Sequence, residues 1–275
     1  MLNANIAGFT TRAKIACAIL LLLMMGGVSA TKPAHAAAPP LALDGVGANT
    51  CQGQFCVQSQ LLTTTKGHDV IILIVECVDG STCDKVSSVS DSSGLTFIQR
   101  ISYSTGDWLG TKLSEYYAIA TSPLNSDNIT VDTCTATLYC VEGMQVLAIH
   151  GANTRAIFDQ NTSIPATVSC PGPGCGDCTA SFNQGTCSAS IQTSTMDFVI
   201  ASTAINDAGP CGLGYPNGVV AGFTNISNNG QSFEVDYAIT TTPQSNVVFS
   251  CNATDAVAIV VDAISFNGAF GISSA

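Results

Sequence analysis

The sequence is poor in charged side chains, and basic side chains are the scarcest. Charged residues make up 10% of the 275 residues, with 8 Lys and Arg against 19 Asp and Glu, so the formal net charge is −11. An acidic surface of this kind repels phosphate backbones and anionic lipid headgroups. The composition therefore argues against nucleic-acid binding and against electrostatic attachment to membranes.

Histidine is also rare, and the common catalytic motifs are missing. Apart from His35 near the N-terminus, the chain has His68 and His150, and each is expected at the end of a strand. No G-x-S-x-G pattern marks a nucleophilic serine, and no H-x-H or H-E-x-x-H pattern offers a site to zinc or copper. The sequence therefore predicts no enzymatic activity.

Long apolar runs are missing outside the N-terminal region. There, Arg12 and Lys14 precede an apolar run of about eleven residues, and small-residue cleavage patterns end at Ala30 and Ala36. A membrane span needs about 20 apolar residues. We interpret residues 1–36 as a signal peptide, with a retained anchor as the alternative. We expect no membrane span after cleavage and a protein that is secreted or displayed on the cell surface.

Cysteine, by contrast, is abundant. Cleavage removes Cys17 and leaves twelve of the 13 cysteines, an even number in an oxidising compartment. It also removes three basic residues, so five remain against 19 acidic ones and the net charge becomes −14. Spacing does not fix connectivity, but nearest-neighbour pairing predicts six disulfides: Cys51–Cys56, Cys77–Cys83, Cys134–Cys140, Cys170–Cys175, Cys178–Cys187 and Cys211–Cys251.

Two alternatives to this pairing stay open. Cys170, Cys175, Cys178 and Cys187 would supply four thiolates to a zinc ion, although export disfavours such a site. Free or intermolecular thiols are the second alternative.

The remaining chain has the pattern of short β-strands separated by turns rich in Gly, Pro, Asn and Ser. Residues 69–77 (DVIILIVEC) form a continuous apolar run that suits a buried strand, whereas residues 94–103 alternate, with Leu95 and Phe97 directed to the core. Further strands are expected at 112–120, 128–134 and 145–150. Because no helical period occurs outside the signal, the sequence predicts an all-β sandwich or barrel.

The second half of the chain repeats the pattern of the first. Five segments correspond in the same order: 69–77 with 196–205, 94–96 with 222–224, 117–119 with 237–239, 128–134 with 246–251, and 146–152 with 256–269. We predict a tail at 37–50, a first β half at 51–158, a Cys-rich loop region at 159–195 and a second β half at 196–275. One sandwich with a common core is favoured over two tandem domains, because five strands alone bury little.

The order of these segments resembles that of uncharacterised secreted and phage-associated β-sandwich proteins of bacteria and archaea. The likeness covers most of residues 57–268 and is carried by SVSDSSGLTF, AIHGAN followed by FDQN, MDFVIAS, DYAI and AIVVDAISF. It implies a jelly-roll or immunoglobulin-like extracellular module used for display, adhesion or assembly, without agreed catalytic residues. The cysteine content departs from that pattern.

A few residues are candidates for binding. Trp108, the single tryptophan, lies in a glycine-rich turn where it would contact a ligand such as a sugar or pack against the sandwich. Glu234 and Asp236 are spaced as in a glycosidase strand, but Ile239 stands where the acid should be. We therefore expect an alternating strand with Phe233, Val235, Tyr237 and Ile239 inward and both carboxylates in solvent.

Modification and cation binding are also predicted from short patterns. No cofactor is expected, and calcium is the one ion left open, with oxygen ligands near Asp84, Asp91, Asp127 and Asp132. Four N-glycosylation sequons begin at Asn128, Asn161, Asn225 and Asn252.

The predicted function is that of a secreted or cell-surface structural or adhesive protein, such as a filament or coat subunit. It would associate with itself or with other surface proteins. Residues 37–48 are apolar and strand-forming, so they would act as a tether or as a donor strand for a neighbouring subunit. The alternative is a carbohydrate-binding module with glycans as partners.

Overall fold

The computed structural model shows an all-β protein. It describes residues 39–49, 58–77, 86, 88–104, 112–132, 143–170, 186–205, 211, 222–228, 233–252 and 257–268. These lie in one compact unit, residues 38–275. The described residues contain no helix that is long and apolar enough to cross a bilayer. They form sixteen strands: β1 (Ala42–Val46), β2 (Ala48–Asn49), β3 (Gln58–Leu62), β4 (Asp69–Cys77), β5 (Ser88–Ser90), β6 (Ile98–Ser104), β7 (Lys112–Ala120), β8 (Asp127–Asp132), β9 (Gly143–His150), β10 (Ala166–Cys170), β11 (Thr186–Ile191), β12 (Asp197–Ile205), β13 (Thr224–Asn228), β14 (Phe233–Ile239), β15 (Val247–Asn252) and β16 (Val257–Ser265).

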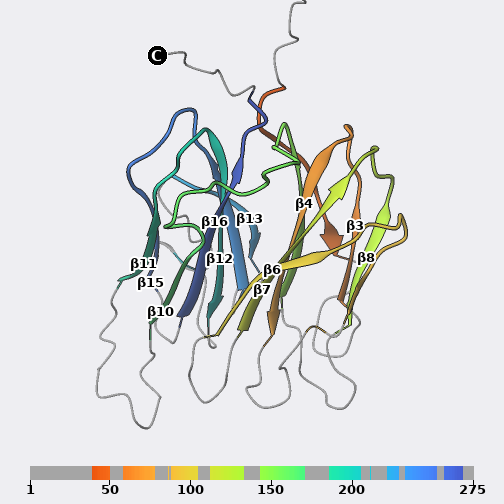
Figure 1. Cartoon of the computed structure of the whole chain (residues 1–275). Helices are drawn as coiled ribbons and strands as arrows, with labels where there is room; N and C mark the ends of the chain where they lie inside the picture. Colours follow the sequence, from red (N-terminus) through yellow and green to blue (C-terminus); the bar gives the residue numbers. More distant parts are fainter. Residues whose placement is uncertain are drawn as a thin grey trace, which may run out of the picture. The chain divides into compact units, whose positions relative to one another are not determined.

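The strands form four sheets. The first large sheet has the order β1-β9-β4-β7-β6, and the second large sheet has the order β10-β16-β12-β14-β13. The first small sheet (β2-β3-β8-β5) and the second small sheet (β11-β15) complete the described fold. Figure 1 shows them as successive layers, with the two large sheets in the middle and a small sheet on each outer side. The chain is therefore a stack of β-sheets, as the sequence predicts, but with more than two layers.

The two large sheets share one topology. Each begins with its first strand in the chain at one edge, followed by its fifth, second, fourth and third strands. The registers also correspond, because Val70 of β4 pairs with Ile119 and Ile149, while Phe198 of β12 pairs with Ile239 and Ile264. This likeness agrees with the repeat seen in the sequence, whose origin by duplication remains a prediction.

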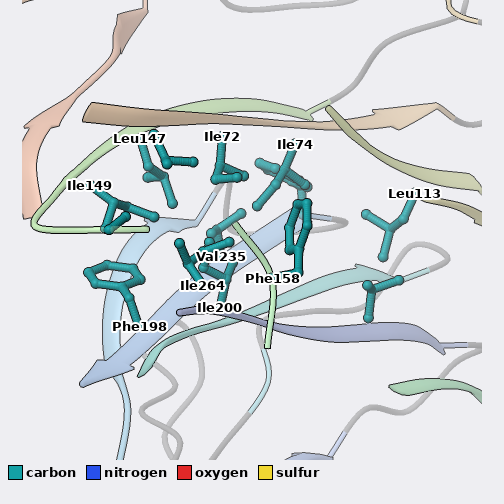
Figure 2. Close-up of a cluster of buried hydrophobic side chains, with 14 of the residues drawn as sticks. Ile72, Ile74, Leu113, Leu147, Ile149, Phe158, Phe198, Ile200, Val235 and Ile264 are labelled. Atoms are coloured by element: carbon teal, nitrogen blue, oxygen red, sulfur yellow. The ribbon is translucent and has the colours of Figure 1, made fainter. Parts of the chain in front are cut away.

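Three hydrophobic clusters fill the spaces between the layers. The central core lies between the two large sheets and includes Ile72 and Leu147 from one and Phe198 and Ile264 from the other. Figure 2 shows these side chains pointing toward one another, with Phe158 between the sheets. One outer core lies between the first large and first small sheets, and another between the second large and second small sheets. The predicted common core is present, and each half also has a core of its own.

This layering explains the continuous apolar strands. In β4, Val70, Ile72 and Ile74 enter the central core, while the alternate residues Ile71 and Leu73 enter the outer core, and all are fully buried. Because both faces of each large sheet are covered, its middle strands lose the polar alternation of a sheet with one solvent face. Burial of both faces is the structural reason for the DVIILIVEC run.

Several predicted boundaries differ in the structure. Residues 42–46 of the predicted tail form the edge strand β1, which pairs with β9 of the same chain and directs Leu43 against the central core. The predicted loop region 159–195 contains two strands, β10 and β11. Both segments complete sheets whose other strands are distant in sequence, which local patterns do not reveal.

Two disulfides lie within the described residues. The predicted Cys211–Cys251 bridge is confirmed. The predicted pairs Cys170–Cys175 and Cys178–Cys187 are both wrong, because Cys170 of β10 bonds to Cys187 of β11. Cys187 and Cys251 face each other across β11 and β15, so both bridges lie together in the outer core. The other cysteines of the predicted pairs lie outside the described residues, or their side chains do.

Candidate functional site

The connection from β9 to β10, residues 151–165, passes from the first half of the chain to the second and is held closely against the end of β16. The Asn153 amide donates to the Ser265 carbonyl at 2.8 Å, the Asp159 amide to Ala263 at 3.0 Å, and the Asn267 amide to Gly151 at 2.8 Å. This connecting segment therefore holds its polar side chains where the two halves meet. Two cavities flank it.

The first, which we call the histidine cavity, has a volume of about 710 Å³. Its walls come from four places in the chain: Pro39 before β1, the turn before β4, the end of β9 with the connecting segment, and the chain after β16. The residues that line it with polar side chains are His68, His150, Asn153, Thr154, Arg155 and Asn267. None of the described residues that line it has an acidic side chain.

One wall of this cavity contains an Asp–His pair. Asp69 begins β4 and His150 ends β9, and the register of these neighbouring strands places His150 Nδ1 2.8 Å from Asp69 Oδ1. Asp69 is fully buried, whereas the His150 side chain is 22% exposed. Burial raises the pKa of Asp69, the bond to His150 opposes this, and the nearby Asp44 charge adds to it. The pair fixes the His150 ring by its Nδ1 edge and leaves Nε2 to other partners.

The backbone around His150 is specialised as well. His68 has a left-handed φ of 61°, an unusual value for a residue other than glycine. Gly151 has φ of 77°, and a Cβ there would lie 2.5 Å from the Pro40 carbonyl oxygen. A glycine is therefore required where the N-terminal segment crosses the connecting segment. The Asn153 side-chain oxygen accepts the amides of Arg155 and Ala156 at 3.0 and 3.1 Å, which fixes the turn that presents Arg155.

The second cavity, which we call the arginine cavity, has a volume of about 380 Å³ and shares Arg155 with the first. Arg100 also lines it, with its guanidinium 3.9 Å above the centre of the Phe158 ring and its Nε 2.8 Å from Asp262 Oδ2. Tyr117 meets the edge of the same ring, with 5.2 Å between centroids. The Arg100 charge is therefore neutralised within the protein, unlike that of the exposed Arg155.

Beneath Arg100, Glu115 and Asp262 meet inside the central core. Both are buried, and neither Glu115 oxygen accepts a hydrogen bond from a donor of the described residues. Burial, and then the Asp262 charge, raise the pKa of Glu115 well above its usual range. Burial also raises the pKa of Asp262, but the hydrogen bond and charge of Arg100 oppose this, so of the two carboxyl groups Glu115 is the one that favours the protonated form.

The positions that correspond to Arg100, Glu115 and Asp262 in the opposite half of the chain are apolar. Arg100 is the bulged residue of β6, and Ile226 is the bulged residue of β13. By the matching registers, Glu115 corresponds to Val235 and Asp262 to Leu147. The three apolar residues Ile226, Val235 and Leu147 lie in or against the central core. The ionic cluster is thus present once in the described fold, although its surroundings occur twice.

Two further carboxyl pairs are buried in the second half. Burial and the neighbouring Asp159 raise the pKa of Asp197 to about 7. Burial and then Asp236 raise the pKa of Glu234 to about 9. The prediction that Glu234 and Asp236 lie in solvent is wrong, because the outer core covers that face of β14. Ile239, expected to point inward, is 40% exposed at the end of the strand.

The structure separates the four sequons. Asn128 is exposed on β8, with its amide 3.5 Å from the Thr130 hydroxyl. The Asn161 side-chain oxygen accepts the amide of Ser163 at 3.0 Å. The Asn225 amide donates to both carboxyl groups of the Glu234–Asp236 pair, at 3.4 and 3.3 Å. Asn252 lies in β15.

The residues suggested for calcium have other roles where they are described. The Asp91 carboxylate accepts the amides of Ser93 and Leu95, and Asp127 accepts the amide and hydroxyl of Ser92. Asp132 is an exposed residue of β8. No group of three or more His, Cys, Asp or Glu residues within the described ranges is placed to hold a metal ion. Asp84 and Trp108 lie outside those ranges.

Sequence reasoning placed His68 and His150 at strand ends, which is confirmed, but it missed the cavity that brings them together. A histidine that ends one strand and an aspartate that begins another are visible in the sequence. Their meeting depends on the pairing of β4 with β9, which the sequence does not state. Comparison of the chain with family models, with curated proteins and with solved structures finds no match.

Proposed function

We propose that the protein is a secreted or cell-surface structural or adhesive protein, with a filament or coat subunit as its specific form. The observation that carries the proposal is the cross-linked outer core, in which two disulfides lie side by side and join strands from distant parts of the second half. Such bridges persist in oxidising compartments. They limit unfolding outside the cell, where no chaperone assists.

The shared central core supports a structural role. Strands from both halves bury a continuous apolar layer, so the halves form one body and not two domains on a flexible linker. Burial of this kind is the dominant favourable contribution to folding. A rigid body of stacked sheets is suited to display or assembly.

The edges of the large sheets offer a route to self-association. The strand β6 is the last of the described strands of its sheet and exposes half of Ile98, so its outer edge is a candidate for pairing with another strand. The strand β1 uses the opposite edge within its own chain. If a neighbour supplied the strand instead, the same Leu41 and Leu43 contacts would link subunits.

Assembly is tested on the native protein purified without reductant. Size-exclusion chromatography with light scattering and electron microscopy should show oligomers or filaments that grow with concentration. A strictly monomeric protein at all concentrations would contradict the filament or coat form. Intact mass without reduction should show no free thiols.

A carbohydrate-binding module is the second candidate. It is favoured by the histidine cavity, whose side-chain hydroxyl, amide and cationic groups match the polar groups that fix small ligands in pockets. A glycan array tests it, with Trp108→Ala as a companion variant. The proposal assigns the Asp69–His150 pair to binding and not to catalysis.

A further inference from the structure

We propose that the histidine cavity binds an acidic saccharide through its carboxylate or sulfate group. That the ligand is a saccharide of a neighbouring surface rests on the proposed adhesive function, whereas the oxyanion site rests on the cavity alone. The first observation is the charge of the cavity lining. In a chain with net charge −11, this cavity is lined by Arg155 and by two of the three histidines, and by no carboxylate.

Arg155 is the main anchor. Its side chain is exposed, and its backbone is fixed by the Asn153 turn. A guanidinium presents parallel N–H donors that match the two oxygens of a carboxylate or sulfate. Since Arg100 is already held by Asp262, Arg155 is the arginine that remains for a ligand.

The histidines add donors from the other wall. Asp69 occupies Nδ1 of His150, so when the ring is protonated its Nε2 is the N–H left for a ligand. His68 precedes Asp69 and lines the same cavity. Asp69 of β4 holds His150, and Arg155 of the connecting segment lines the cavity with both histidines. The two walls of the cavity therefore present cationic and N–H groups toward the same space.

The neutral hydrogen-bonding groups and the volume of the histidine cavity suit a sugar. The Asn153 oxygen is occupied by two amides, so its NH₂ group is what it offers to the cavity. Thr154 and Asn267 add groups that bond hydroxyls. The volume of about 710 Å³ lies within the range of small-molecule sites.

Calorimetry on the mature protein at mildly acidic pH tests the site with four probes: glucuronate, glucose 6-sulfate, glucose and inorganic sulfate. Glucuronate or the sulfated sugar should bind and glucose should not. Arg155→Ala should weaken binding by about tenfold or more, as expected when a charge-assisted bond is lost. His150→Gln should retain a bond to Asp69 but weaken glucuronate binding, because the ring Nε2 is lost.

Lys66→Ala is the matched control, because Lys66 is an exposed cation of the turn before β4 that does not line the cavity. An equal loss in this variant, or equal binding of glucose and glucuronate, overturns oxyanion recognition. Inorganic sulfate binding as tightly as the sugars supports the oxyanion site and overturns a saccharide as its ligand. Circular dichroism verifies that each variant folds. A monomeric protein that still binds glucuronate would contradict the assembly role and leave this site intact.

Discussion

Replacing Glu115 by Gln should remove one pH-dependent contribution to stability from the central core. In the folded protein Glu115 shares a buried space with Asp262 and Arg100, and burial raises the pKa of its carboxyl group well above the ordinary value of 4.5. The folded state therefore holds a proton that the unfolded chain releases. Stability from this group is full below the unfolded pKa and is lost as the pH rises toward the folded pKa.

The magnitude follows from proton linkage. One proton retained on folding changes the free energy of unfolding by about 1.4 kcal/mol per pH unit. This slope applies at pH values between the unfolded pKa and the raised folded pKa of Glu115. Gln resembles the protonated acid, so Glu115→Gln should match the wild type below the unfolded pKa and gain on it by up to about 1.4 kcal/mol for each pH unit above it.

The assay is urea unfolding of the non-reduced protein, followed by far-ultraviolet circular dichroism across this pH range. Asn125→Ser is the control, since Asn125 is exposed and does not titrate, so its change should leave the slope unaltered. An unchanged slope in Glu115→Gln would refute the assignment of the proton to Glu115. So would a variant that is less stable than the wild type at every pH.

Three further outcomes are expected, each measured as a free energy of unfolding. Replacing Cys211 and Cys251 by Ala should cost about 4 kcal/mol on the loop-entropy model, and equal midpoints with and without the bridge would argue against it. Gly151→Ala should cost clearly more than Gly94→Ala, because both glycines have a left-handed φ but a Cβ meets backbone at the first and open space at the second; equal costs would contradict the close approach. Asn225→Asp should destabilise by about 1 kcal/mol at neutral pH, because it replaces an amide donor to Glu234 and Asp236 by an exposed carboxylate, and an equal loss in acid would contradict this.

The strands were predictable because each large sheet has a strong local signal. The run at 69–77 is short, β-branched and apolar, and it forms β4 as expected. The same holds for β12 and β16, which fall on the repeated segments. An apolar run without alternation also implies that both faces of a strand are covered. That information is local, so the sequence contains it.

The site was not predictable in the same way, because it depends on long-range pairing. Arg100 and Asp262 are 162 residues apart, and only the contact between the two large sheets brings them together. Glu234 and Asp236 illustrate a second limit. Alternation shows that a strand has two faces, but it does not show that a further layer covers the outer one. Cysteine spacing gave the wrong partner for Cys170 for a related reason. Its partner Cys187 lies in a different sheet, and only the packing of the two sheets brings the sulfur atoms together.

The cluster of Arg100, Glu115 and Asp262 occurs once in the described fold, so it distinguishes the two otherwise similar large sheets. The large sheets have matching shapes, so either could stack on a copy of itself when many chains emerge together. Two first halves stacked in this way would enclose Arg100 and Glu115 against Leu147 in place of Asp262. Arg100 would then lose its ion pair with Asp262 and keep only Glu115, whose burial disfavours the charged form. Such a stack should therefore be less stable than the pairing of the two halves within one chain.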